Sequence, residues 1–170
     1  VTLVSGPVHL ATPRDVRRVD VETAAEMHAA VMREVGDAHV FIAAAAVADY
    51  APGKRAVQKI KKKGAPTLAL SMQKTPDILA EVARRRQRPY TVGFAAETEH
   101  LEKHAWDKLD KKHLDLVAAN LVGAGRGFDR DDNALTVYWK GGAEELGHAS
   151  KLDLARRLVK FIADRYPQKS

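Results

Sequence analysis

The pattern of apolar residues along the chain predicts four buried strands. Each is almost continuously apolar: VTLVS at 1–5, VFIAAAAVA at 40–48, YTVGFAA at 90–96 and LDLVAAN at 114–120. Strands of a parallel sheet that is covered on both faces have this composition, because neither face meets water. RRVDV at 17–21 is a candidate fifth strand.

Helical periodicity separates these strands. Between 22 and 35, Met27 and Val31 belong to one apolar face that repeats every three or four residues, and Gly36 ends the pattern. Further helices are predicted at 76–86, 98–112 and 151–166.

Strands that alternate with helices favour an open α/β sheet built from right-handed crossovers. We therefore predict one Rossmann-like domain over residues 1–170, a three-layer fold around a mostly parallel sheet. Two regions interrupt the alternation of strands and helices, and their sequences predict a protruding β arm or hairpin. Residues 50–75 read as an irregular loop leading to an arm, and residues 133–147 as a hairpin that turns at Gly141 and Gly142.

The composition is that of an ordinary soluble domain that carries positive charge. The chain is 45% hydrophobic and 29% charged, with a net charge of +6, which predicts attraction to nucleotides, phosphorylated metabolites or nucleic acid. It has no cysteine, which excludes disulfides and thiolate metal sites and fits the cytoplasm. Its apolar runs are far shorter than the roughly 20 residues that span a bilayer.

Ligands of open α/β sheets bind outside the carboxyl ends of the strands. In this chain Asp49 and the lysine-rich stretch QKIKKK follow one predicted strand, Phe94 and AAET another, and Asn120 a third. These residues are expected to meet at one edge of the sheet. QKIKKK alone also fits a solvated surface or a nucleic-acid patch.

Two helices carry features that suit anions. In KTPDIL, Thr75 is expected to cap a helix that starts at Pro76, which leaves amide groups for an anion. The motif alone favours a plain helix start over an anion site. In 98–112, Lys108 and Lys112 lie within or beside the apolar stripe, so they either meet an anion or extend past the core to water at the helix end.

Other chemistries have weaker support. The seven histidines show no metal-ligand spacing, and His100 and His104 read as surface residues. The second interpretation of the sequence is an NAD(P)-binding oxidoreductase. It lacks support because the dinucleotide-binding motif G-x-G-x-x-G is missing. A basic nucleic-acid-binding module is the third, and it lacks interleaved aromatic residues.

The order of several motifs resembles the bacterial phosphopantothenoylcysteine synthetase family over nearly the whole chain. They are VTLVSGPV, AAAAVADY, KIKKK, KTPDIL, YTVGFAAET, LDLVAAN and GFDRDDNALTVYW. The resemblance implies a phosphopantothenate–cysteine ligase of coenzyme A biosynthesis. Such an enzyme activates 4′-phosphopantothenate with CTP as an acyl-cytidylate, and L-cysteine then displaces CMP to form an amide.

The resemblance also implies site residues. Lys59 matches the essential catalytic lysine, and Ala45 and Ala46 match small residues beside the substrate. Asp49 matches an acid at both the nucleotide and the substrate. The remaining nucleotide-binding matches are Lys59, Pro76, Asp77, Ile78, Leu79, Phe94, Lys108 and Lys112.

The family's other properties complete the expectation. It implies Mg²⁺ with CTP, no metal held by protein ligands alone, and no flavin in this domain. The expected partners are a second copy of the chain, joined partly through the arm at 60–75 and the neighbouring hairpin, and a fused flavin-dependent decarboxylase domain. No nucleic acid and no membrane are expected. The chain starts at Val1, and we expect a family segment to precede it, whose asparagine is associated with converting the acyl intermediate.

Overall fold

The computed structural model describes residues 1–54, 58, 67, 69–123 and 130–166. The chain divides into two compact units. The first comprises Val1–Glu34 and Ala45–Ile78, and the second comprises Val35–Ala44 and Leu79–Ser170. The prediction of one domain over the whole chain stays a prediction.

The first unit begins with a parallel strand pair and a helix. β1 (Thr2–Ser5) pairs with β2 (Arg17–Asp20), and α1 (Ala24–Glu34) packs against β1. A capping box starts the helix: the Thr23 hydroxyl accepts from the Glu26 amide at 3.1 Å, and the Glu26 carboxylate accepts from the Thr23 amide at 3.1 Å. The predicted helix and both strands are therefore confirmed.

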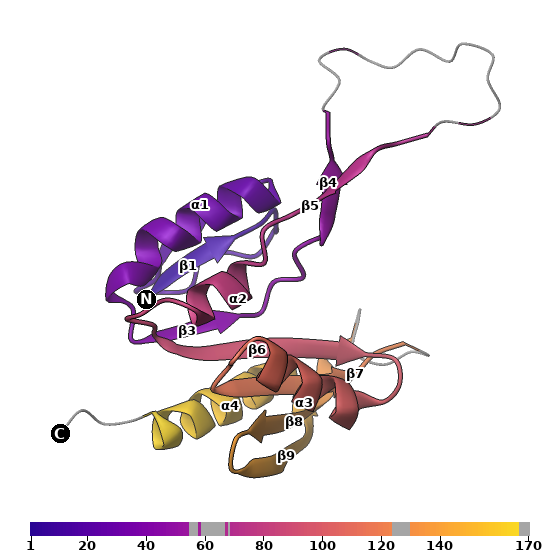
Figure 1. The fold of residues 1–170 in the computed structure, drawn as a ribbon. Helices are drawn as coiled ribbons and strands as arrows, with labels where there is room; N and C mark the ends of the chain where they lie inside the picture. Colours follow the sequence, from indigo (N-terminus) through magenta and orange to yellow (C-terminus); the bar gives the residue numbers. More distant parts are fainter. Residues whose placement is uncertain (55–57, 59–66, 68, 124–129, 167–170) are drawn as a thin grey trace. The chain divides into compact units, whose positions relative to one another are not determined.

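The same unit holds the base of the predicted arm. β4 (Tyr50–Pro52) and β5 (Met72–Lys74) pair antiparallel as a separate two-stranded sheet, seen beyond β1 and α1 in Figure 1. Most of the intervening sequence, including Lys59, lies outside the described residues.

The second unit is built on a five-stranded sheet of order β3-β6-β7-β8-β9. The first three strands are parallel: β3 (Val40–Ala43), β6 (Tyr90–Glu97) and β7 (Leu116–Leu121). β8 (Asp132–Trp139) and β9 (Gly142–Ser150) add the predicted hairpin antiparallel at the other edge. The parallel part of the prediction thus holds for the three strands of this sheet that precede the hairpin, β3, β6 and β7.

Helices cover both faces of this sheet. α2 (Ile78–Ala83) and α3 (Leu101–Lys111) pack on one face, with Leu79, Ala105 and Leu109 in the core. α4 (Lys151–Arg165) packs on the other through Leu154, Leu158, Phe161 and Ile162. The three-layer prediction is confirmed for this unit, as Figure 1 shows.

Two strand predictions are corrected. The strand expected at 40–48 ends at Ala43, because the alanines that follow have low β propensity despite being apolar. A short helical turn, η1 (Val35–Asp37), precedes it. In addition, β1 and β2 pair only with each other among the described residues instead of joining the larger sheet. An apolar run predicts a strand but does not predict which other strand it pairs with.

Candidate functional site

The predicted lysine face of α3 lies against β6. The ammonium group of Lys108 donates to the carbonyl oxygen of Phe94 at 2.5 Å. Phe94 is one residue beyond the last pair of β3 and β6, Ala43 with Gly93. On that side β6 has no strand neighbour at Phe94 among the described residues, so the early end of β3 leaves room for a side chain to reach its backbone.

Gly93 allows α2 and α3 to approach this part of β6. A Cβ atom placed on Gly93 would lie 2.8 Å from Cδ2 of Leu79, 2.9 Å from Cδ1 of Leu114 and 3.8 Å from Cε of Lys108. The first two distances are too short for carbon atoms in van der Waals contact. Three residues predicted for nucleotide binding, Leu79, Phe94 and Lys108, are therefore brought together around a residue that the sequence analysis did not single out.

Phe94 contributes its backbone on this face, and its ring packs elsewhere. The ring joins the apolar cluster on the α4 side of the sheet, since alternate strand residues point to opposite faces. Lys112 follows α3 as its C-terminal cap, half-buried, with its amide donating to the carbonyl of Lys108 at 3.2 Å. Lys108 and Lys112 are thus one helical turn apart, as predicted.

The remaining predicted residues belong to the first unit, where Thr75 links two of their segments. The Thr75 amide donates to the carbonyl of Asp49 at 2.9 Å, and its hydroxyl donates to the carbonyl of Ala48 at 2.6 Å. The loop that follows β3 therefore adjoins the segment that leads into α2. Exposure in these segments is uneven: Ala45, Ala46, Asp49, Pro76 and Asp77 are exposed, while Ile78 is buried.

The predicted helix cap at Thr75 is wrong. The helix begins at Ile78, two residues after Pro76, and the Thr75 hydroxyl donates to a carbonyl of the preceding loop. A threonine hydroxyl can cap a helix or can donate to a carbonyl elsewhere in the chain. The local sequence does not reveal the second contact, because its partner lies 27 residues earlier. The predicted catalytic residue Lys59 lies outside the described residues, so its placement is not part of this site.

One polar pair beside the lysine face was not predicted as functional. The Nδ1 atom of His104, on α3, lies 2.8 Å from Oε2 of Glu97 at the end of β6. Glu97 belongs to the AAET motif, but its partner seven residues later carries no sequence signature. The prediction that His104 is a surface residue holds only in part, since its side chain is 42% exposed.

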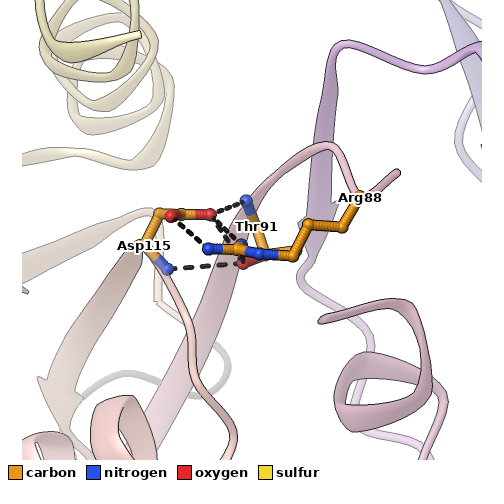
Figure 2. Close-up of polar contacts among 3 residues, drawn as sticks. All are labelled: Arg88, Thr91 and Asp115. Carbon is orange, nitrogen blue, oxygen red and sulfur yellow. Dashed lines mark hydrogen bonds and ion pairs between the residues drawn. The ribbon is translucent and has the colours of Figure 1, made fainter. Parts of the chain in front are cut away.

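A second polar cluster joins β6 and β7 at their amino ends, the ends away from Glu97 and Asn120. Figure 2 shows Arg88 donating to both carboxylate oxygens of Asp115, which also accepts from the amide and hydroxyl of buried Thr91 at 2.7 and 2.9 Å. The hydrogen-bonded Asp115 carboxylate raises the pKa of Arg88. The cluster is at the amino ends of these parallel strands, away from the edge where ligands bind, and we assign it a structural role.

A pocket of about 490 Å³ lies at the carboxyl end of β7, lined by residues of β7, β8 and β9 with Leu101 and Arg130. Asn120, which the sequence placed at this edge, is 9% exposed and belongs to its lining. On the same wall Arg130 donates to Asp132 at 3.3 Å and lowers the pKa of that carboxyl group.

Within the described ranges, no three acidic or histidine side chains gather where they could hold a metal ion. The described helices likewise include none long and apolar enough to cross a membrane.

Comparisons with known proteins agree with this architecture. The chain is 52% identical to the coenzyme A biosynthesis bifunctional protein CoaBC of Vibrio cholerae over 168 residues, which cover 97% of this chain and 42% of that protein. The Escherichia coli protein of the same name is 47% identical and covers 100% of this chain and 43% of that protein. The chain therefore spans about two fifths of the length of these curated relatives.

A solved structure gives the same result. The crystal structure of the C-terminal domain of a coenzyme A biosynthesis bifunctional protein CoaBC superimposes with a TM-score of 0.77 at 34% identity, covering 95% of this chain and 71% of that one. The model of the DNA/pantothenate metabolism flavoprotein C-terminal domain matches residues 1–166. The chain belongs to the DNA/pantothenate metabolism flavoprotein C-terminal domain family.

Proposed function

We propose that the chain is the phosphopantothenate–cysteine ligase part of a coenzyme A biosynthesis enzyme. The observation that carries the proposal is the docking of Lys108 against the backbone of β6 at Phe94, in a chain whose relatives are named for coenzyme A biosynthesis. A cation held at that strand position suits a ligand that brings phosphate groups to the sheet.

The proposed reaction has two steps. A carboxylate oxygen of 4′-phosphopantothenate attacks the α-phosphorus of CTP, the bond to the bridging oxygen of the β-phosphate breaks, and pyrophosphate leaves. The amine of L-cysteine then attacks the acyl carbon, the bond to the cytidylate oxygen breaks, and CMP leaves as the amine loses a proton. Activation is needed because a free carboxylate is a poor acyl donor.

The main obstacle to this chemistry is charge, since a triphosphate, a second phosphate and a carboxylate must meet. Cations placed in advance where negative charge develops lower such a barrier. We assign this work to Lys59, Lys108 and Lys112, with Lys59 acting on the phosphates during activation.

The other site residues have supporting roles in the proposal. Ala45 and Ala46 offer a surface without bulky side chains on which the substrate can lie. Asp49 contacts nucleotide and substrate, and the segment from Pro76 to Leu79 holds the nucleotide. Mg²⁺ enters with CTP, and the phosphates and water supply most of its ligands.

The proposal extends to assembly. We propose that two chains pair through the β4–β5 arm, because Tyr50, Leu70 and Met72 are apolar and 58%, 62% and 46% exposed. Exposed strand edges that carry apolar side chains are commonly covered by a partner chain. We further propose that the full-length protein adds a flavin-dependent decarboxylase domain, so that flavin binds outside this chain, and that it works in the cytoplasm.

The test is pyrophosphate release by the full-length protein that carries this chain. Release should require CTP, Mg²⁺ and 4′-phosphopantothenate together, and adding L-cysteine should yield CMP and the amide product. ATP in place of CTP examines nucleotide selectivity, and titration with NAD(H) examines the oxidoreductase interpretation. NAD(H) binding without any CTP-dependent pyrophosphate release would overturn the proposal.

A further inference from the structure

Among the described residues, a second polar contact accompanies that of Lys108 between α3 and β6. Lys108 reaches the carbonyl of Phe94, and one turn earlier His104 reaches the carboxylate of Glu97 at 2.8 Å. His104, Lys108 and Lys112 are spaced by four residues, so they share one side of the helix. The two contacts therefore hold the side of α3 that carries both lysines.

The N-cap residue of α3 does not hold the start of the helix with its side chain. Its N-cap residue, His100, has a left-handed backbone conformation with φ of 50°, and its side chain makes no capping hydrogen bond. Apolar packing through Leu101 and Ala105 holds the helix against the sheet. Packing of this kind is not directional, so it fixes the distance between helix and sheet better than the rotation of the helix about its axis.

The Glu97–His104 contact fixes the rotation of α3 about its axis, which apolar packing leaves less well defined. The Glu97 side chain is on the α3 side of β6, because it alternates in step with Ala95, which packs in the cluster beneath α3. A hydrogen bond from this fixed strand position to the first half of α3 sets the rotation of the helix. The ammonium groups of Lys108 and Lys112, four and eight residues later, follow that rotation.

We infer that Glu97 and His104 are positioning residues for the nucleotide: their contact orients α3 so that Lys108 and Lys112 meet the phosphates of CTP. This inference rests on the proposed function and assigns neither residue a contact with the substrates. Two contacts one turn apart define an orientation that Lys108 alone, on a flexible stem, does not.

The test is a double-mutant cycle on CTP affinity, measured by calorimetry with Mg²⁺ in the full-length protein. Glu97→Ala and His104→Ala are each expected to weaken CTP binding roughly 2- to 30-fold. The double variant should be no weaker than the worse single variant, because both remove the same contact. Glu97→Gln keeps an oxygen that accepts from His104 and should restore most of the affinity.

Two controls separate positioning from loss of structure. Glu99→Ala changes an exposed acid between β6 and α3, two residues after Glu97, and should leave CTP affinity unchanged. Affinity for 4′-phosphopantothenate alone should also stay unchanged in all variants, whereas general loss of structure would weaken both ligands.

Three results would overturn the inference. The first is unchanged CTP affinity in Glu97→Ala and His104→Ala when the wild type binds CTP. The second is additive losses in the double variant. The third is wild-type protein that does not bind CTP at all, which refutes the proposed function and the inference with it.

Discussion

Replacing Gly93 with alanine should destabilise the second unit and misplace Lys108. The new Cβ would lie 2.8 and 2.9 Å from methyl carbons of Leu79 and Leu114, and both leucines are only 7% exposed. Neither side chain can move away without disturbing the packed face beneath α2 and α3. Overpacking of this kind costs about 1 to 3 kcal/mol of unfolding free energy, or roughly 2 to 4 °C in Tm for each kcal/mol.

Urea denaturation followed by circular dichroism measures this change, and Gly36→Ala is the matched control. Gly36 has no atom within 4 Å of the position that its Cβ would occupy, so its unfolding free energy should change by less than about 0.5 kcal/mol. CTP affinity should fall in Gly93→Ala only, because α3 carries Lys108. Identical denaturation midpoints for wild type and both variants would show that the leucines repack freely and would refute the reasoning.

Three further changes test other parts of the molecule. Lys59→Gln in the full-length protein should abolish acyl-cytidylate formation, detected by chromatography, with the circular dichroism spectrum retained; normal formation of the intermediate would remove its catalytic role. Asp115→Asn should lower the unfolding free energy by about 1 to 3 kcal/mol, because Arg88 and buried Thr91 lose an acceptor, whereas exposed Asp110→Asn should not. Leu70→Glu combined with Met72→Glu should give a monomer in sedimentation with weaker CTP binding, and an unchanged dimer would exclude the arm as the interface.

The sequence predicted the elements of the fold better than their arrangement. All four helices and the strands β3, β6 and β7 were predicted because their periodicities are local properties of the chain. The separate pairing of β1 with β2 was not predicted, since an apolar strand looks the same whichever strand it joins. The end of β3 at Ala43 was missed because the prediction gave more weight to apolarity than to β propensity.

For the candidate site, the sequence predicted which residues take part but not which of their atoms make the contacts. Helical spacing predicted that Lys108 lies beside the apolar stripe of α3, and the contact with β6 agrees with that placement. Phe94 was predicted from its place at the end of an apolar strand and from family resemblance, and neither says which of its atoms is used. In the structure its carbonyl meets Lys108 while its ring packs on the far face of the sheet.

The early end of β3 connects these observations. Alanines after Ala43 stop the strand, so the ladder between β3 and β6 ends at Gly93. At that residue the missing side chain lets Leu79 and Leu114 come close to the sheet, and one residue later the strand has a carbonyl within reach of Lys108. Alanines after the end of β3, together with Gly93 in β6, thus leave the backbone of β6 open to the ammonium group of Lys108 on α3. A valine or isoleucine run at 43–46 would satisfy the same apolar pattern and would favour continued pairing at Phe94, so the choice of alanine is what leaves the Phe94 carbonyl open to Lys108.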